Sequence, residues 1–354
     1  MILLGSTGSI GVNTLNIARE FNLNVDTLVA GNNYKLLNEQ IKEFKPKNVV
    51  VSNKDIAQKI DFKDIKYGEN AILDAIEESE SEIVVNALVG EVGLKPTLKA
   101  NECNKRLALA NKESLVIAGK FVDTSKLTPI DSEHFGLWYL LNDRPIKKLN
   151  ITASGGALRD YPLEKLHTAT LDKVLNHPNW SMGMKITIDS ATMVNKLFEV
   201  IEAKWLFDIN NIDAVIETSS TIHSFIDFID GSTTAHIAYP DMRLPIAFAL
   251  LGKVEKEIVS HIDFNKLSKL EFRQIDIERY PIWQIKDEFI KNPDLGVIIN
   301  TVNEIAIKKF VNKEINFGDI SKMILNSVEK YNNLTIDNIG NIFEIQQQIK
   351  SDFN

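Results

Sequence analysis

The chain has 354 residues, 44% hydrophobic and 25% charged, which is the balance of a globular protein too long for one compact core. Lys and Arg number 40 against 48 Asp and Glu, a net charge of −8, and no basic run or basic-aromatic stripe occurs, so we expect no nucleic-acid partner. The single cysteine, Cys103, excludes an internal disulfide and a cysteine-cluster metal site, and no apolar stretch is long enough to span a bilayer; we expect a cytoplasmic protein with no membrane partner.

The first 130 residues alternate short β-branched runs with amphipathic stretches. The pattern predicts strands at 1–6, 24–31, 46–53, 81–88 and 106–112, and helices at 11–21 and 34–44. Strands and helices that alternate at this spacing indicate an α/β fold with a doubly wound parallel sheet. We therefore assign residues 1–130 to an N-terminal, Rossmann-like dinucleotide-binding domain.

The pattern changes after Asp131. We expect strands at 148–156 and 185–192 and hairpin-like strands over 214–240, around the turn Asp230-Gly231. From about residue 281 the pattern turns helical, and "GDISKMILNSVEKY" predicts a helix with Asp319 as its N-cap. We predict a central α+β catalytic domain at 131–253, which contains a mobile loop at 177–183. A linker at 254–280 then leads to a C-terminal helical domain at 281–354.

The stretch "LLGSTGSIG" places Gly5, Gly8 and Gly11 between a predicted strand and a predicted helix. In such a unit the first helical turn offers unpaired N–H groups and partial positive charge, and glycine lets a pyrophosphate approach the backbone. The G-x-x-G-x-x-G spacing is weak evidence alone, and a plain strand–helix turn is the alternative. The β-α-β context favours the phosphate-binding interpretation.

The end of the second strand bears on the choice of dinucleotide. NAD-binding proteins usually carry an acidic residue there, which holds the ribose hydroxyls and would repel a 2′-phosphate. This chain has Gly31, Asn32 and Asn33, with Lys35 nearby. The absence of an acidic side chain favours NADP over NAD.

Three acidic residues are candidate metal ligands. Asp131 and Glu133, in "PIDSEH", would point the same way in an extended segment, although an isolated pair of this kind is more often a surface feature. In "DSATMVNKLFEVIEAKWLF", apolar residues recur at helical spacing and leave Asn195, Lys196 and Glu199 together on the other face. That face is either solvated or presents Glu199 to a metal. Three carboxylates suit Mg²⁺ or Mn²⁺, not zinc or copper.

Two serines are candidate anion ligands. Ser154 follows a predicted strand and precedes two glycines, and Ser190 begins the predicted helix that carries Asn195 and Lys196. Hydroxyl and backbone N–H groups at such a position bind anions. The four residues would together form a compact phosphate site.

The stretch "NHPNWSMGMK" has no helix or strand pattern but carries His177 and Trp180. A tryptophan in a polar loop with Gly and Pro is either half-buried or part of a moving lid. His177 alone would more often be structural than catalytic. His223 lies on an apolar alternating strand, where a buried core histidine is the default.

Eight ordered stretches resemble one family, the 1-deoxy-D-xylulose 5-phosphate reductoisomerases of the non-mevalonate isoprenoid pathway. They run from residue 5 to about residue 251. No single stretch is specific, but the ordered set is. In chain order they are "GSTGSIG", "LALANKES", "PIDSEH", "ITASGG", "HPNWSMG", "KITIDSATMVNK", "IHSFIDFIDGS" and "PDMRLPIAFAL".

The resemblance implies NADPH as the cofactor. The glycine turn would hold the pyrophosphate, residues 31–33 would lie at the adenosine end, and Met242 would lie near the nicotinamide. The implied cofactor contacts are Gly5, Thr7, Gly8, Ser9, Ile10, Gly31, Asn32, Asn33, Asn111, Glu113, Gly183 and Met242.

The resemblance also implies a divalent cation, Mg²⁺ or Mn²⁺, and a sugar phosphate substrate. Asp131, Glu133 and Glu199 would be the metal ligands and, with Lys112, the catalytic residues. Trp180 would cover the substrate carbons. The implied substrate contacts are Lys112, Ser132, Glu133, Ser154, His177, Trp180, Ser190, Asn195, Lys196 and Glu199.

The activity that this resemblance implies is conversion of 1-deoxy-D-xylulose 5-phosphate to 2-C-methyl-D-erythritol 4-phosphate, by rearrangement and then hydride transfer, in a homodimer. Two alternatives remain. A semialdehyde dehydrogenase would need a cysteine nucleophile, and Cys103 lies in a polar stretch without a nearby histidine in sequence. A non-catalytic NADP-binding regulator would keep the glycine turn but has no need of three carboxylates.

Overall fold

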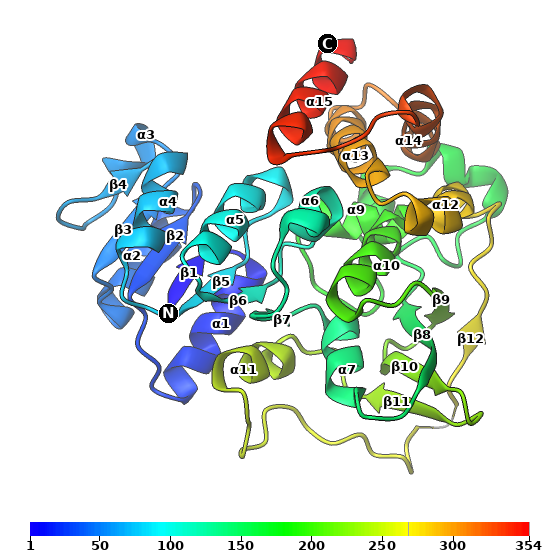
Figure 1. The fold of residues 1–354 in the computed structure, drawn as a ribbon, viewed down its shortest axis with the longest axis horizontal. Coiled ribbons are helices and arrows are strands. Elements are labelled where there is room, and N and C mark those ends of the chain that lie inside the picture. Colours follow the sequence, from blue (N-terminus) through cyan, green and yellow to red (C-terminus); the bar gives the residue numbers. More distant parts are fainter. Residues whose placement is uncertain (268, 354) are drawn as a thin grey trace. The chain divides into compact units, whose positions relative to one another are not determined.

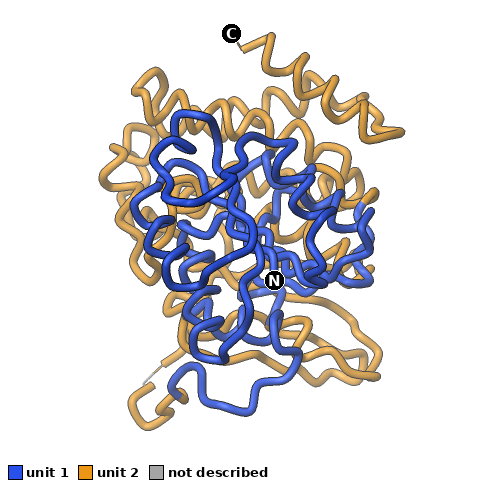
Figure 2. Tube along the Cα trace, turned by 90° about the vertical axis from the view of Figure 1, so that its left-hand side faces the viewer, with its two compact units in different colours: residues 1–114, 122–135, 241–260 blue, residues 115–121, 136–240, 261–354 orange. Residues whose placement is uncertain are grey.

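The computed structural model describes residues 1–267 and 269–353. The chain divides into two compact units, which are coloured separately in Figure 2. The first unit comprises residues 1–114, 122–135 and 241–260, and the second unit comprises residues 115–121, 136–240 and the chain from 261 onward. Within the described ranges, no helix is both long and apolar enough to cross a membrane.

The first unit contains a seven-stranded sheet whose strands all run parallel, as predicted. The strand order is β4-β3-β2-β1-β5-β6-β7, so the chain starts in the middle and winds outward in both directions (Figure 1). The central strands are apolar on both faces, which is typical of a sheet covered on both sides. The strands are β1 (Ile2–Leu4), β2 (Thr27–Ala30), β3 (Asn48–Val51), β4 (Lys66–Tyr67), β5 (Ile83–Asn86), β6 (Arg106–Leu109) and β7 (Leu127–Pro129).

The helices of this unit follow the predicted strand–helix alternation. Ile246 and Leu250 of α11 (Arg243–Leu251) belong to the same buried core as Leu3 and Leu28, so this late segment packs in the first unit and not in the central region of the chain. The remaining helices of this unit are α1 (Ser9–Glu20), α2 (Tyr34–Phe44), α3 (Lys54–Ala57), α4 (Glu69–Glu78), η1 (Gly90–Gly93) and α5 (Leu94–Glu102). Three further helices lie wholly or partly in the second unit: α6 (Glu113–Ala118), η2 (Gly119–Phe121) and α7 (Ser132–Leu140).

The second unit contains a mixed five-stranded sheet in the order β11-β10-β8-β9-β12. The hairpin around Asp230-Gly231 is confirmed, because β10 and β11 pair antiparallel across that turn and Gly231 has φ +90°. The short strand β12 falls in the predicted linker 254–280. The strands are β8 (Ile146–Ala153), β9 (Ile212–Glu217), β10 (Ile222–Phe228), β11 (Thr233–Ile237) and β12 (Phe272–Arg273).

Residues 185–192 form a helix, so the strand predicted there is wrong. The alternating letters "KITI" are typical of a strand. In the fold, however, Ile188 and Ala191 are buried at helical spacing, so tertiary packing overrides the local propensity. The chain then turns at Met193, with φ +71°, before the next helix. The helices of this stretch are η3 (Leu163–Thr168), α8 (Leu171–Val174), α9 (Met184–Thr192) and α10 (Val194–Phe207).

The helical pattern predicted after residue 281 is confirmed. The prediction that Asp319 is the N-cap of α14 is wrong, because Asn316 occupies that position. The Asp319 side chain accepts from the Asn316 backbone N–H at 2.9 Å and completes a capping box. Packing places these helices in the second unit together with the central sheet. They are η4 (Pro281–Ile285), α12 (Lys286–Lys291), α13 (Leu295–Val311), α14 (Phe317–Tyr331) and α15 (Ile339–Asp352).

Candidate active site

The glycine turn joins β1 to α1. The backbone N–H groups of Gly5 and Ser6 donate to Val29 O at 2.9 and 2.8 Å. Gly5 has φ +87°, and a Cβ at Gly11 would stand 2.2 Å from Gly5 O. These two glycines are therefore required for α1 to pack against its own strand. A Cβ added at Gly8 would lie 3.4 Å from its nearest neighbour, Gly5 O, so this position has room for a methyl group.

The N-terminus of α1 is suited to an anion. Its N-cap is Gly8, which supplies no side-chain cap, and the first turn carries no acidic residue. Gly8 and Ser9 are exposed, and Thr7 and Ile10 are partly exposed. Free N–H groups and the helix dipole at such an end favour a phosphate.

Residues 31–33 follow β2 at the carboxyl edge of the parallel sheet, next to the glycine turn that follows β1. All three residues are exposed. Asn33 caps α2, because its Oδ1 accepts from Leu36 N at 3.3 Å, and Asn32 Oδ1 accepts from Ser52 Oγ at 3.0 Å. Amides and a hydroxyl are thus gathered at this edge.

Residues 111–113 follow β6 and are buried. The Asn111 amide donates to Leu88 O and Gly90 O, each at 2.9 Å, and so fixes the loop after β5. Lys112 Nζ lies 2.7 Å from Asp131 Oδ2. The ammonium group is therefore held beside a predicted metal ligand.

Asp131 and Glu133 lie at the start of α7, so the extended segment predicted for them is wrong. Asp131 precedes the helix, and its Oδ1 accepts from Glu133 N at 3.2 Å; Ser132 Oγ donates to Glu133 Oε2 at 2.7 Å. The carboxylate of Asp131 thereby caps the helix. His134 is fully buried, with Nδ1 3.3 Å from Asp131 Oδ1.

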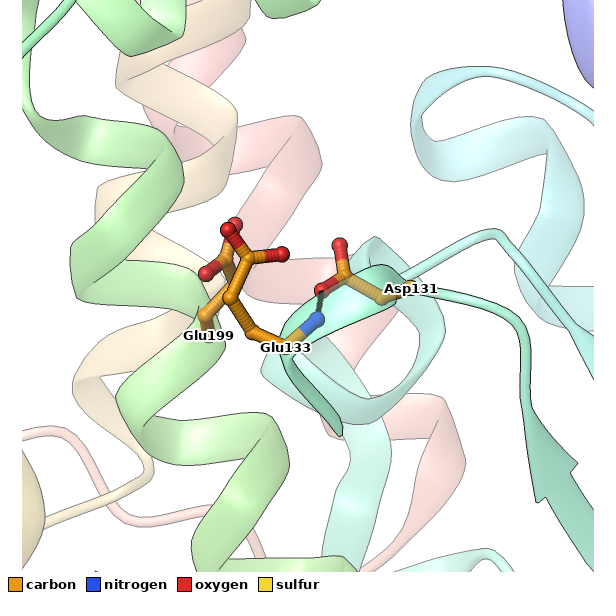
Figure 3. A group of neighbouring side chains, drawn as sticks. All are labelled: Asp131, Glu133 and Glu199. Carbon is orange, nitrogen blue, oxygen red and sulfur yellow. Dashed lines mark hydrogen bonds between the residues drawn. The ribbon is translucent and has the colours of Figure 1, made fainter. Parts of the chain in front are cut away.

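Glu199 lies on α10 with Asn195 and Lys196, as predicted. The solvated alternative is wrong, because Glu199 is 1% exposed and Lys196 4%. Asn195 Nδ2 donates to Glu199 Oε1 at 2.5 Å, and Lys196 Nζ donates to Glu199 Oε2. Figure 3 draws Glu199 with Asp131 and Glu133: one carboxylate oxygen from each lies within 4.8 Å of the others.

His177 bonds the two predicted anion-binding serines. Its Nε2 lies 2.9 Å from Ser154 Oγ and 3.4 Å from Ser190 Oγ. Its Nδ1 accepts from the backbone N–H of Asn179 and Trp180 at 3.1 and 3.0 Å. The ring proton therefore sits on Nε2 and points at the serines. The prediction that Ser190 begins the helix that carries Asn195 and Lys196 is wrong. Ser190 lies in the last turn of α9, and the chain turns before α10 begins at Val194.

The environment of His177 keeps the ring neutral. Burial, and to a lesser degree the charge of Arg159, lowers the pKa of His177 to about 4. Trp180 contacts the ring of His223 edge to face, with centroids 6.3 Å apart. His223 is buried, and its Nε2 bonds Ala238 O at 3.1 Å, as expected of a core histidine.

Two other predicted cofactor contacts have clear positions. Met242 is the N-cap of α11 and packs against the core of the first unit, the unit that carries the glycine turn. Gly183 is the N-cap of α9, and nothing lies within 4 Å of the Cβ it lacks. No packing constraint therefore explains Gly183.

The sequence pattern gave no indication of several supporting residues. Asp189, beside Ser190, is buried and is bonded by Asn303 Nδ2 at 2.7 Å and by Lys185 Nζ at 2.8 Å. Glu217 is fully buried at the end of β9. An acidic residue at the end of an apolar strand was the only signal for Glu217, and nothing in the helical pattern of α13 pointed to Asn303.

These features are typical of the NADP-dependent oxidoreductases with a Rossmann-like domain: a glycine turn before a helix, no acidic residue after β2, and a carboxylate group suited to a divalent cation. Family comparisons narrow this class. Residues 1–119 match the 1-deoxy-D-xylulose 5-phosphate reductoisomerase model, 127–207 its C-terminal domain, and 237–352 a further C-terminal domain of DXP reductoisomerase.

Relatives match over the whole chain. A protein of Nautilia profundicola named 1-deoxy-D-xylulose 5-phosphate reductoisomerase is 61% identical over 99% of this chain and 98% of its own length, and one of Wolinella succinogenes with the same name is 48% identical over the same shares. A solved DOX-P reductoisomerase in complex with NADPH, fosmidomycin and magnesium has a TM-score of 0.93 at 32% identity, covering 99% of this chain and 96% of that one. The Zymomonas mobilis enzyme in complex with NADPH has a TM-score of 0.88 at 33% identity, covering 99% and 97%.

The chain therefore belongs to the 1-deoxy-D-xylulose 5-phosphate reductoisomerase family, and it is an NADP-dependent oxidoreductase. This membership removes both alternatives. Cys103, the nucleophile that a semialdehyde dehydrogenase would need, is the C-cap of α5.

Proposed function

We propose that this chain converts 1-deoxy-D-xylulose 5-phosphate to 2-C-methyl-D-erythritol 4-phosphate in the non-mevalonate isoprenoid pathway, with NADPH and Mg²⁺ or Mn²⁺ as cofactors. Support comes from relatives with this name over the full length and from similar solved structures whose descriptions include NADPH and magnesium. The observation that carries the proposal is the group of three carboxylates, Asp131, Glu133 and Glu199.

The first unit offers a fitting surface for NADPH. The open N-terminus of α1 suits the pyrophosphate, and the amide-rich edge at residues 31–33 suits a ribose with a 2′-phosphate, since no carboxylate is there to repel it. Thr7, Ser9 and Ile10 supply the first-turn contacts. The remaining proposed contacts of the first unit are Gly5, Gly8, Asn111, Glu113 and Met242, and the second unit contributes Gly183.

The carboxylate group fits a hard divalent cation. Three oxygens within 4.8 Å of one another would repel strongly without a positive charge among them, and oxygen donors are those that Mg²⁺ and Mn²⁺ prefer. Lys112 and Lys196 each pair with one of these carboxylates. Each pair places a positive ammonium group directly beside a candidate metal ligand.

When bound, the cation supplies Lewis-acid stabilisation of the substrate oxygens and NADPH supplies the hydride. Lys112 is held at Asp131, where its ammonium group would donate a hydrogen bond or a proton to a developing alkoxide. Ser132 hydrogen-bonds Glu133 and orients that carboxylate. These residues act on the reacting end of the substrate.

The other end of the substrate is the phosphate. Ser154, Ser190 and the Nε2–H of His177 form one group of donors, and Asn195 and Lys196 supply two more on α10. Binding of this remote phosphate orients the carbon skeleton for reaction. Trp180, in the 177–183 loop, covers the carbons and excludes water from the aldehyde intermediate.

We further propose a homodimer in the cytoplasm. The single half-buried cysteine fits a reducing compartment. Large apolar side chains in the second unit, including Ile229 at 69% exposure and Phe272 at 47%, fit a surface that a second copy covers.

The test is the oxidation of NADPH by the purified chain with 1-deoxy-D-xylulose 5-phosphate, with and without a chelator. We expect turnover that stops on chelation and returns with Mg²⁺ or Mn²⁺, and 2-C-methyl-D-erythritol 4-phosphate as the product. Turnover that is unaffected by complete removal of the metal would refute the carboxylate site. A different product would refute the assigned reaction.

A further inference from the structure

The turn between β9 and β10 is built around one buried carboxylate. Glu217 is fully buried. It accepts hydrogen bonds from Ser219 N at 2.9 Å, Ser219 Oγ at 2.7 Å, Thr221 N at 2.7 Å and Ile222 N at 3.2 Å. Four donors on one carboxylate hold the turn in a single shape, with Ser220 at φ +55°. None of these four hydrogen bonds uses Thr218 O or Ser220 Oγ, which accept from other segments.

Those two oxygens anchor two other segments. Asn179 Nδ2 donates to Thr218 O at 3.1 Å and to Ser220 Oγ at 2.8 Å. Arg159 Nη1 donates to the same Thr218 O and to Ser154 O, each at 2.9 Å. The turn thus binds both the 177–183 loop and the segment that carries Ser154.

Asn179 also shapes the loop from inside. Its backbone N–H and that of Trp180 donate to His177 Nδ1, which turns the Nε2–H toward Ser154. The position of the Asn179 backbone therefore sets the direction of the imidazole. The side chain of Asn179 fixes that backbone to the turn.

We infer that Asn179 is a positioning residue that fixes the 177–183 loop in place, by bonding its carboxamide to the turn that Glu217 builds. Asn179 acts through His177 and Trp180 and has no assigned contact with substrate. The inference rests on the proposed function for its kinetic consequence. Its structural part concerns the loop alone.

The structural part is tested by hydrogen exchange of the backbone amides of residues 177–183 in the full chain without substrate. Asn179→Ala removes both bonds to the turn, and we expect exchange there to become about tenfold faster. Ser220→Ala removes one acceptor and should give a smaller increase. Asn176→Ala, at an exposed position of the same segment, is the matched control and should change nothing.

A spectroscopic readout separates positioning from general destabilisation. The pKa of His177 is lowered to about 4 chiefly by burial. In Asn179→Ala the ring gains water, so its pKa, followed by NMR of labelled histidine, should rise toward 6.5. Exchange in the β10–β11 hairpin should stay unchanged. Exchange that rises equally over the whole second unit would overturn the inference in favour of global unfolding.

Kinetics complete the test. We expect Asn179→Ala to raise the KM for 1-deoxy-D-xylulose 5-phosphate about tenfold while the Kd for NADPH changes less than about threefold, because Gly183 is the one proposed cofactor contact within this loop. Unchanged loop exchange and an unchanged His177 pKa in Asn179→Ala would overturn the inference whatever the activity. If the wild-type chain lacks reductoisomerase activity but Asn179→Ala still speeds exchange in the loop, the proposed function is refuted. The positioning role of Asn179 then stands.

Discussion

Glu199 is held by the two polar side chains that precede it by one turn on α10. Asn195 and Lys196 each donate to one of its oxygens, so the carboxylate is fixed in orientation in a nearly dry environment. Helical spacing accounts for this, since residues i, i+3 and i+4 share a face. Burying a carboxylate is costly unless it is paired and hydrogen-bonded, and these two donors offset that cost.

For Glu199→Gln we expect NADPH to bind as in the wild type while the affinity for Mn²⁺ falls at least tenfold and turnover is lost. The neutral amide removes one anionic ligand and places an NH₂ group against one of the two donors, Asn195 or Lys196. Mn²⁺ titration followed by electron paramagnetic resonance, with NADPH fluorescence in parallel, measures both affinities. Glu329→Gln, at an exposed position on α14, is the control. Full turnover in Glu199→Gln would rule out its role as a ligand.

The depressed pKa of His177 has a consequence for stability. In the unfolded chain the ring titrates near 6.5, whereas in the fold its pKa is about 4. The stabilisation is therefore complete above pH 6.5 and is lost as the pH falls toward 4, by at most about 1.4 kcal/mol per pH unit. His236, whose pKa burial also lowers to about 4, adds a contribution of the same sign.

We expect His177→Gln to flatten the loss of unfolding free energy between pH 6.5 and 4, because glutamine does not titrate. Urea unfolding at several pH values in this window measures it. Part of the slope should persist through His236. An identical slope in the variant and the wild type would show that His177 titrates normally.

At the scale of elements, the β1–α1 turn shows that similar glycines have different roles. Gly11 faces backbone so closely that a Cβ must displace α1, whereas Gly8 has room for one. Gly8 also has φ −80°, which any residue adopts. The G-x-x-G-x-x-G pattern therefore combines a packing requirement with an open helix end.

We expect Gly11→Ala to lower the melting temperature markedly and to abolish NADPH binding, since α1 must move from its strand. Gly8→Ala should keep the unfolding free energy within about 0.5 kcal/mol of the wild type. If the helix end is the pyrophosphate site, the added methyl group should still weaken NADPH binding. Calorimetry with and without NADPH measures both effects, and equal melting temperatures for the two variants would contradict this account.

The pairing of α9 with α13 links the C-terminal helices to the site. Asn303 on α13 bonds the buried carboxylate of Asp189, the residue before Ser190. An amide donor at that point satisfies a charge that would otherwise be buried at a cost. The helical C-terminal region thus supports the segment that carries Ser190, although its sequence has no motif of its own.

At the scale of the whole molecule, the two compact units are not continuous in the chain. The first unit gathers residues 1–114, 122–135 and 241–260, so the polypeptide leaves it and returns. The predicted boundaries at 131, 253 and 281 follow changes in sequence pattern. Because buried contacts, not pattern, define a compact unit, the observed units differ from these segments.

We expect the chain to sediment at twice its own mass at micromolar concentration, as a homodimer would. Exposed apolar side chains of the second unit, such as Phe272, are costly in a monomer. Equilibrium sedimentation over a hundredfold range of concentration measures the mass. A single-chain mass throughout would contradict the dimer.

Much of the candidate site could be predicted from sequence because its signals are local. The glycine turn, the amides after β2 and the Asn195–Glu199 face each lie within one short segment, and periodicity places their side chains. The prediction of residues 185–192 as a strand failed because a short apolar alternation fits both periods. Packing in the folded chain, which buries Ile188 and Ala191 at helical spacing, decided in favour of a helix.

The sequence by itself determined the parallel sheet, the glycine turn between β1 and α1 and the three candidate carboxylates, since strand and helix periods and turn chemistry are properties of neighbouring residues. The tertiary structure alone decided that Asn179 meets Ser220, that Arg159 joins Ser154 to Thr218, and that Asn303 meets Asp189, 114 positions apart. The physical reason is that a buried polar group must find its partner wherever the packed chain brings one, and no local pattern records that partner.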